Sequence, residues 1–117
     1  MIISQALNEA RLNSVVAFLG AAATMVIYDA TDTPLVTVAL PNPVGVVADN
    51  VLTLAASEEA MILASGNAAK ASLINSNGQL ALGDVAVTDL NGNGPLKLSE
   101  TMLYAGGYTR LVGGALG

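Results

Sequence analysis

The feature that most constrains the fold is a succession of short apolar runs, each ended by Asn, Asp, Ser, Gly or Pro. The spacing of the runs is close to the 8–12 residues typical of all-β domains. The runs cover residues 25–28, 35–40, 44–47, 51–54, 60–64, 69–74, 80–87, 96–98, 102–104 and 108–112. With no second helical pattern beside them, they predict an all-β fold, a β-sandwich or a jelly-roll-like barrel of about eight short strands.

The N-terminal segment has a different period and predicts one amphipathic helix over residues 4–19, with Ser4 as N-cap and Gly20 as its stop. Its apolar positions are Ala6, Leu7, Ala10, Val15 and Leu19, and we expect Glu9 and Asn13 on the exposed side. The helix is either a lid on the core or an arm that docks on a neighbouring subunit. We expect one domain, with residues 1–20 as helix or arm and 21–117 as β-sandwich.

Three turn segments carry specific expectations. Residues 29–34 join the first two strands as a hairpin loop, and Pro41-Asn42-Pro43 predicts a corner or sheet switch, because proline cannot donate to a ladder. Asn77-Gly78 favours a type I′ turn. The glycine pairs 106–107 and 113–114 are interpreted as turns and a flexible tail.

The amino-acid composition excludes most kinds of catalytic and metal-binding site. The 117 residues contain no Cys and no His, so thiolate and imidazole metal sites, Cys nucleophiles and Ser-His relays are all excluded. The net charge is −5, and the four basic residues are scattered, which argues against nucleic acid as a direct partner. Only 3% of residues are aromatic, so a deep small-molecule pocket is not expected. We predict no enzymatic activity, no catalytic residue and no cofactor.

The segment Asp89–Glu100 matches the twelve-residue calcium-loop pattern, with oxygen side chains at positions 1, 3 and 5, glycine at 6 and a carboxylate at 12. Its flanks read as strands, only two of its side-chain ligands are charged, and Lys97 is expected to point outward. We therefore favour a plain long hairpin loop without metal. A calcium-dependent binding module, for carbohydrate among other ligands, remains the competing hypothesis.

Other candidate constellations have simpler interpretations. Glu58-Glu59 is interpreted as a solvated turn, since neighbours in sequence do not share a strand face. The serines have no base to activate them. The glycine clusters lack the lysine and the strand-to-helix context of a phosphate loop.

One uncharged stretch, residues 15–28, could be mistaken for a membrane segment. It is about 14 residues long, shorter than the roughly 20 that span a bilayer, and Gly20 lies within it. Glu9 and Arg11 make a poor basic region for a signal peptide. We expect a soluble, unexported protein without a membrane partner.

Several segments together resemble a group of small virion proteins from tailed bacteriophages. The matching segments are residues 8–12 (NEARL), 25–28 (MVIY), 35–41 (LVTVALP), 65–69 (SGNAA) and 73–78 (LINSNG), followed by Gly83. The resemblance extends from residue 8 to about residue 114 and departs in residues 56–61 and in the short second turn.

The resemblance implies a β-sandwich subunit that is repeated many times in a virus particle. Its most direct implication is a capsid decoration or cement protein that binds the major capsid protein and copies of itself, located in the virion after assembly in the host cytoplasm. A neck or tail structural protein is the alternative. The apolar, charge-poor composition suits broad contact between subunits.

Overall fold

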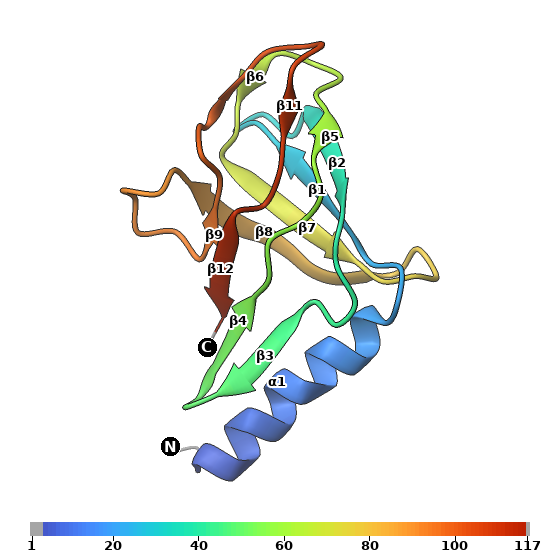
Figure 1. Cartoon of the computed structure of the whole chain (residues 1–117), viewed down its shortest axis with the longest axis vertical. Coiled ribbons are helices and arrows are strands. Elements are labelled where there is room, and N and C mark those ends of the chain that lie inside the picture. Colours follow the sequence, from blue (N-terminus) through green and yellow to red (C-terminus); the bar gives the residue numbers. More distant parts are fainter. Residues whose placement is uncertain (1–3, 117) are drawn as a thin grey trace.

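Eight of the strands form one curled, mixed sheet (Figure 1). The computed structural model describes residues 4–116, and the prediction of an all-β fold with one N-terminal helix is confirmed. In spatial order the strands of the sheet are β2 (Pro34–Ala39), β1 (Thr24–Tyr28), β7 (Lys70–Ile74), β8 (Leu80–Thr88), β9 (Leu96–Lys97), β12 (Gly113–Leu116), β4 (Val51–Leu54) and β3 (Gly45–Ala48).

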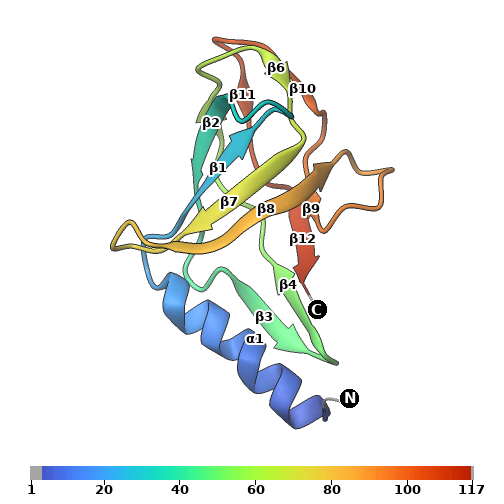
Figure 2. The same ribbon diagram turned by 180° about the vertical axis from the view of Figure 1, so that it is seen from behind.

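Two small ladders lie at the end of the long axis opposite the helix, which we call the apical end (Figure 2). β5 (Ala60–Met61) pairs with β11 (Tyr108–Thr109), and β6 (Gly66–Asn67) pairs with β10 (Met102–Leu103). β5, β10 and β11 are shorter than the apolar runs at 60–64, 102–104 and 108–112 that predicted them, and no apolar run predicted β6.

The sheet consists of two antiparallel halves joined by one parallel contact, in which Val87 of β8 lies beside Leu96 of β9. Strands β2, β1, β7 and β8 form one half, and β9, β12, β4 and β3 form the other. Because the sheet curls, buried residues from both halves form a single hydrophobic cluster, for example Met25 and Leu73 with Leu52.

The helix α1 (Gln5–Leu19) begins and ends as its sequence predicts. The Ser4 hydroxyl accepts the Leu7 N–H at 3.2 Å, and Gly20, with a φ of 73°, donates its N–H to the Val16 carbonyl. Leu12 and Leu19 are buried in the core, so the helix closes one end of it as a lid. Within residues 4–116, no helix is long and apolar enough to cross a membrane.

The buried side of α1 matches the predicted one only in part: Leu19 is buried and Val15 packs against the core, as expected. Ala6, Leu7 and Ala10 are exposed, whereas Leu12 is buried. Apolar residues occur on two sides of this helix, so periodicity alone does not decide which side meets the sheet.

Glu9 is also on the inner side, contrary to the prediction, whereas Asn13 is exposed as expected. The Glu9 carboxylate accepts the backbone N–H of Asn50 at 3.2 Å, and the Asn8 side chain donates to the Asn50 carbonyl. Asp49 and Asn50 both have positive φ, as a two-residue type I′ turn between β3 and β4 requires. Two side chains of α1 thus form hydrogen bonds with backbone groups of this turn.

The first hairpin and the proline corner are confirmed. β1 and β2 pair antiparallel around the loop that begins at Asp29, whose carboxylate accepts the N–H groups of Thr31 and Thr33. After β2, the segment with Pro41 and Pro43 carries the chain to β3, which lies at the opposite end of the sheet order.

The Asn-Gly hairpin forms between β7 and β8, but its turn type differs from the prediction. Gly78 has a φ of 80° and donates its N–H to the Asn75 carbonyl at 3.0 Å, whereas Asn77 has no positive φ. The buried Asn75 side chain accepts the N–H groups of Asn77 and Gln79 and therefore fixes a longer loop with glycine at its end.

The prediction of a flexible tail at Gly113-Gly114 is wrong. These glycines begin β12, which lies between β9 and β4 inside the sheet. A Cβ at Gly114 would lie 2.6 Å from the Pro95 carbonyl oxygen, so glycine permits a close approach of two backbones there. In a sequence, glycine usually indicates the end of a strand. At this position it is required for the contact between two strands.

This contact predicts a difference between adjacent glycines. We expect Gly114→Ala to lower the free energy of unfolding by about 1–3 kcal/mol, because the new methyl group overpacks against the backbone. Gly113→Ala is the matched control, since its nearest neighbour, the Leu54 carbonyl oxygen, would lie at 3.7 Å. Urea unfolding of both variants measures the difference, and equal losses would contradict the close approach.

The loop at Asp29 predicts a pH dependence. The pKa of Asp29 lies below its usual 3.8, because the carboxylate accepts the backbone N–H of Thr33 and the hydroxyl of Thr31. The unfolded chain therefore takes up this proton at a higher pH than the folded one, so stability is lost as pH falls below about 4. Urea midpoints at pH 5 and pH 3 should differ less for Asp29→Asn than for the wild type; an unchanged difference would exclude this role.

Candidate docking surface

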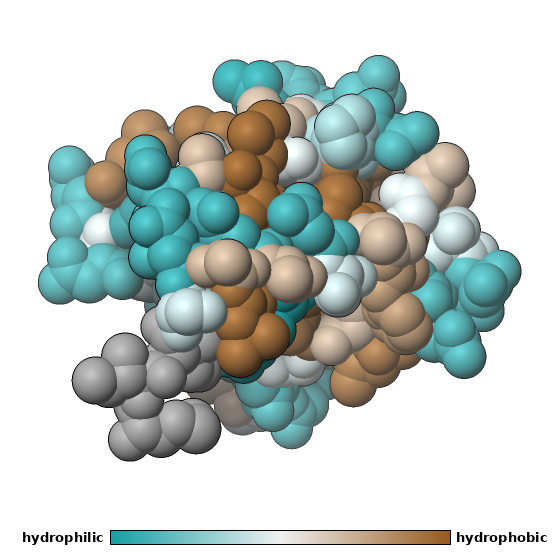
Figure 3. Space-filling model, turned by 90° about the horizontal axis from the view of Figure 1, so that it is seen from below, coloured by the Kyte–Doolittle hydropathy of each residue, from teal (hydrophilic) through white to brown (hydrophobic). Residues whose placement is uncertain are grey.

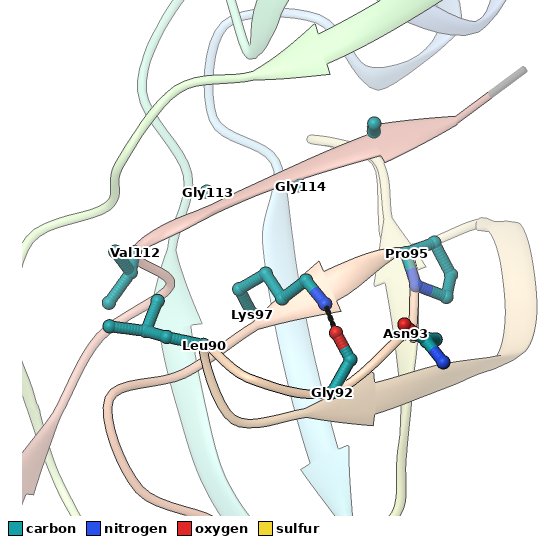
Figure 4. A pocket seen from close by; sticks show the side chains of 10 residues that line it. Leu90, Gly92, Asn93, Pro95, Lys97, Val112, Gly113 and Gly114 are labelled. Carbon is teal, nitrogen blue, oxygen red and sulfur yellow. Dashed lines mark hydrogen bonds between the residues drawn. The ribbon is translucent and has the colours of Figure 1, made fainter.

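The loop that resembles a calcium loop follows β8 and returns the chain to β9. Because β8 and β9 are parallel, this loop is not the hairpin that the sequence predicted. Together with β12 it surrounds an open hollow of about 670 Å³, which has Leu90 and Val112 along one side and Pro95 on the other (Figure 4).

Lys97 points into this loop and not outward, which corrects the sequence prediction (Figure 4). Its ammonium group donates to the Gly92 carbonyl and, at 3.3 Å, to the Thr88 hydroxyl. The Gly94 N–H also donates to the Thr88 hydroxyl oxygen. The ammonium group of Lys97 thus binds the oxygens of Gly92 and Thr88, where a calcium loop would hold its ion.

The remaining calcium-type ligands do not converge. The Asp89 carboxylate accepts the Asn91 N–H at 3.0 Å, and Glu100 lies in a different hollow, beside Met102 and Tyr104. Among residues 4–116, no three His, Cys, Asp or Glu side chains are grouped as a metal site requires.

The other residues that the sequence analysis considered either are exposed or bind backbone groups of the fold. Glu58 and Glu59 are exposed, and Ser57 is buried, where its hydroxyl accepts the Leu111 N–H at 2.8 Å. Gly106 has a φ of 89° in a tight turn closed by a hydrogen bond from the Gly107 N–H to the Tyr104 carbonyl. The described part of the chain brings none of these groups together as a catalytic set.

A different surface stands out, at the apical end. Tyr104 and Tyr108 are 65% and 66% exposed, and Met61 and Met102 are about half exposed. Tyr108 and Met61 are direct partners across the β11–β5 ladder, and Met102, Tyr104 and Tyr108 line one shallow hollow. We call these four residues the apical patch.

The backbone beneath the apical patch is well held. Ile62 donates to the Gly107 carbonyl at 2.8 Å and accepts the Gly106 N–H at 2.9 Å. The Ser65 hydroxyl accepts the Ala105 N–H. Ile62 and Leu103 are buried in the core. The patch is therefore presented on an ordered support, which lowers the entropic cost of binding.

The hollow in the apical patch has one charged residue in its lining. Glu100 lines the same hollow, which has no basic residue in its lining. Both lysines are engaged elsewhere: Lys97 in its loop, and Lys70 with Asp32 and Asp84. The hydrogen bond that the Lys70 ammonium donates to the Asp32 carboxylate raises the pKa of Lys70.

Sequence reasoning did not single out the apical patch. Its residues come from three separate short strands and one turn, and each run alternates exposed with buried positions. One signal was present: two of the three tyrosines flank the Gly106-Gly107 pair in a chain with few aromatic residues.

Comparison of the chain with protein-family models, with curated proteins and with solved structures finds no significant match.

The position of Lys97 predicts a metal-independent loop. We expect added Ca²⁺ to leave the melting temperature unchanged, because the Lys97 ammonium group already binds the Gly92 carbonyl and the Thr88 hydroxyl. Lys97→Met should lower the free energy of unfolding by about 1–3 kcal/mol, since it removes hydrogen bonds from a charged donor.

Arg110→Met is the control for the lost charge, because Arg110 is exposed. Its effect should stay within about 0.5 kcal/mol. A rise of the melting temperature with Ca²⁺ would refute the structural role of Lys97 and restore the calcium hypothesis.

Proposed function

We propose that this chain is a structural subunit of a tailed-bacteriophage virion, a capsid cement or decoration protein. In this role it stabilises the phage head by binding the major capsid protein. The proposal joins the resemblance of the sequence to small virion proteins with one structural observation, the apical patch.

The patch has the composition of a protein-binding surface. Tyr and Met are enriched in the cores of protein interfaces, and aromatic residues contribute a large share of hot-spot energy. Here two tyrosines and two methionines lie together over an ordered support, and an acidic residue, Glu100, lies at their margin. Such a surface fits an apolar segment of a partner that carries basic residues at its edge.

The distribution of cations supports a protein partner over nucleic acid. With Lys70 and Lys97 engaged in internal contacts, Arg11 and Arg110 are the other basic side chains of the sequence. Binding to a phosphate backbone gains its affinity from several clustered cations, which release counterions. Two separate arginines supply little of that energy.

A cement subunit acts by linkage. It binds the assembled shell more tightly than it binds free shell subunits, so each bound copy lowers the free energy of the assembled state. No catalytic group is needed for this work. The calcium-dependent module is not favoured, because Lys97 binds inside the loop that would hold the ion.

The apical patch predicts which variants lose binding. Tyr104→Ala and Tyr108→Ala should each weaken binding to heads by roughly 30-fold, the equivalent of a hot-spot loss of about 2 kcal/mol. Leu90→Ala is the control, because Leu90 is 57% exposed but lies in the loop after β8. Co-sedimentation with heads from a phage that encodes the chain, prepared without it, measures the binding.

Two further results belong to the same experiment. Heads that carry the wild-type chain should withstand a higher temperature than heads that lack it. Equal resistance to heat, or recovery of the chain only with necks or tails, would contradict the role as capsid cement.

A further inference from the structure

Three Asn-Gly pairs lie in two loops of the chain. Asn77-Gly78 lies between β7 and β8, and Asn91-Gly92 and Asn93-Gly94 lie between β8 and β9. All three asparagines are exposed. The two loops protrude on opposite sides of the molecule (Figure 1), and both of these margins are hydrophilic when seen from the helix end (Figure 3). Water therefore reaches each pair.

Asparagine is a thermolabile residue, and most of all where glycine follows it. The backbone nitrogen of the glycine attacks the side-chain carbonyl carbon of the asparagine, a carbon–nitrogen bond forms, and the side-chain amide leaves as ammonia. Water then opens the resulting five-membered imide at one of its two carbonyls and leaves aspartate or isoaspartate. Glycine favours the attack because it has no Cβ to hinder it. The attacking nitrogen must first lose its proton, so a hydrogen bond that holds the N–H slows the reaction.

In the folded chain each of the three glycine N–H groups donates a hydrogen bond. The acceptors are the Asn75 carbonyl for Gly78 at 3.0 Å, the Asp89 carbonyl for Gly92 at 3.2 Å, and the Thr88 hydroxyl for Gly94 at 3.2 Å. The first two acceptors are backbone groups of tight turns, whereas the third is a side chain. The Asn93-Gly94 pair is therefore the one whose protection depends on the identity of another residue.

We propose that Asn93 is a deamidation site that the Thr88 hydroxyl protects. By accepting the Gly94 N–H, this hydroxyl keeps the proton on the nitrogen that would attack Asn93. The same oxygen accepts a hydrogen bond from the Lys97 ammonium at 3.3 Å, and the hydroxyl donates to the Asp89 carbonyl at 3.1 Å. A hydroxyl oxygen has two lone pairs, and both are used here. Loss of this single oxygen frees the Gly94 nitrogen.

Close packing explains why the labile pair contains glycine. A Cβ at Gly94 would lie 2.7 Å from Cγ2 of Thr88, and a Cβ at Gly92 would lie 2.5 Å from Cβ of Thr88. At Gly78, in contrast, no atom lies within 4 Å of such a Cβ, and the φ of 80° is what favours glycine. Thr88 thus requires glycine after Asn93 and also holds the N–H that this glycine makes reactive.

The modification changes the loop that joins the two halves of the sheet. Both products carry a carboxylate where Asn93 has a neutral amide, in the lining of the hollow that also contains Lys97 (Figure 4). Isoaspartate also lengthens the backbone of the loop by one methylene group. In the imide the Gly94 nitrogen has no proton, so its hydrogen bond to Thr88 is lost. Deamidation at Asn93 is therefore expected to loosen the contact between β8 and β9, whether or not the chain has a place in a virion.

Peptide mass spectrometry after incubation of the folded chain at pH 8 tests the proposal, because it measures conversion at each asparagine separately. Thr88→Val removes the hydroxyl, and conversion at Asn93 should rise roughly 3- to 10-fold, the effect of one hydrogen bond on a rate. Asn77 and Asn91 are controls within the same molecule and should keep their wild-type rates. Thr88→Ser retains a hydroxyl and should keep Asn93 near its wild-type rate.

Two measurements on the wild type make the test independent of how well Thr88→Val folds. Amide hydrogen exchange should show the Gly94 N–H protected in the folded chain. Unfolding in urea should accelerate conversion at Asn93, because the chain then no longer holds this N–H.

Three results would overturn the inference. The first is an unchanged rate at Asn93 in a folded Thr88→Val chain. The second is an equal increase at Asn91 and Asn93, which would indicate a general loosening of the loop. The third is a Gly94 N–H that exchanges as fast in the folded wild type as in the unfolded chain.

Discussion

The structure depends on the short parallel contact between β8 and β9. Each half of the sheet is antiparallel within itself, and this contact makes them one sheet around one core. Thr88 is central to it, because its hydroxyl oxygen accepts hydrogen bonds from the Gly94 N–H and from Lys97. A parallel neighbour normally requires a long crossover. Here a short loop brings the chain back parallel to β8, and the loop is closed by a lysine and by two glycines that pack on Thr88.

Local patterns predicted the elements well where one residue type determines the geometry. The helix over residues 4–19 matches α1, and the run at 51–54 matches β4. The proline corner marked the switch between the sheet halves. Such features depend on backbone chemistry within a few residues, which the sequence contains directly.

The predictions that proved wrong concern residues whose position depends on contacts with residues distant in the sequence. Glu9 turned inward because a turn about forty residues away offers it a backbone N–H. Lys97 points into its loop because the Gly92 carbonyl and the Thr88 hydroxyl accept hydrogen bonds from its ammonium group there. The Gly113-Gly114 pair became a strand because Pro95 lies against it. Periodicity carries no information about such partners.

The apical patch lies at one end of a molecule 44 Å long, on two-residue ladders that are separate from the eight-stranded sheet. The ladders are held by their own backbone hydrogen bonds and by Ile62 and Leu103 in the core. The side chains displayed at this end can therefore vary without any change in the pairing of the main sheet, so the shape of the molecule and the chemistry of its tip are set independently.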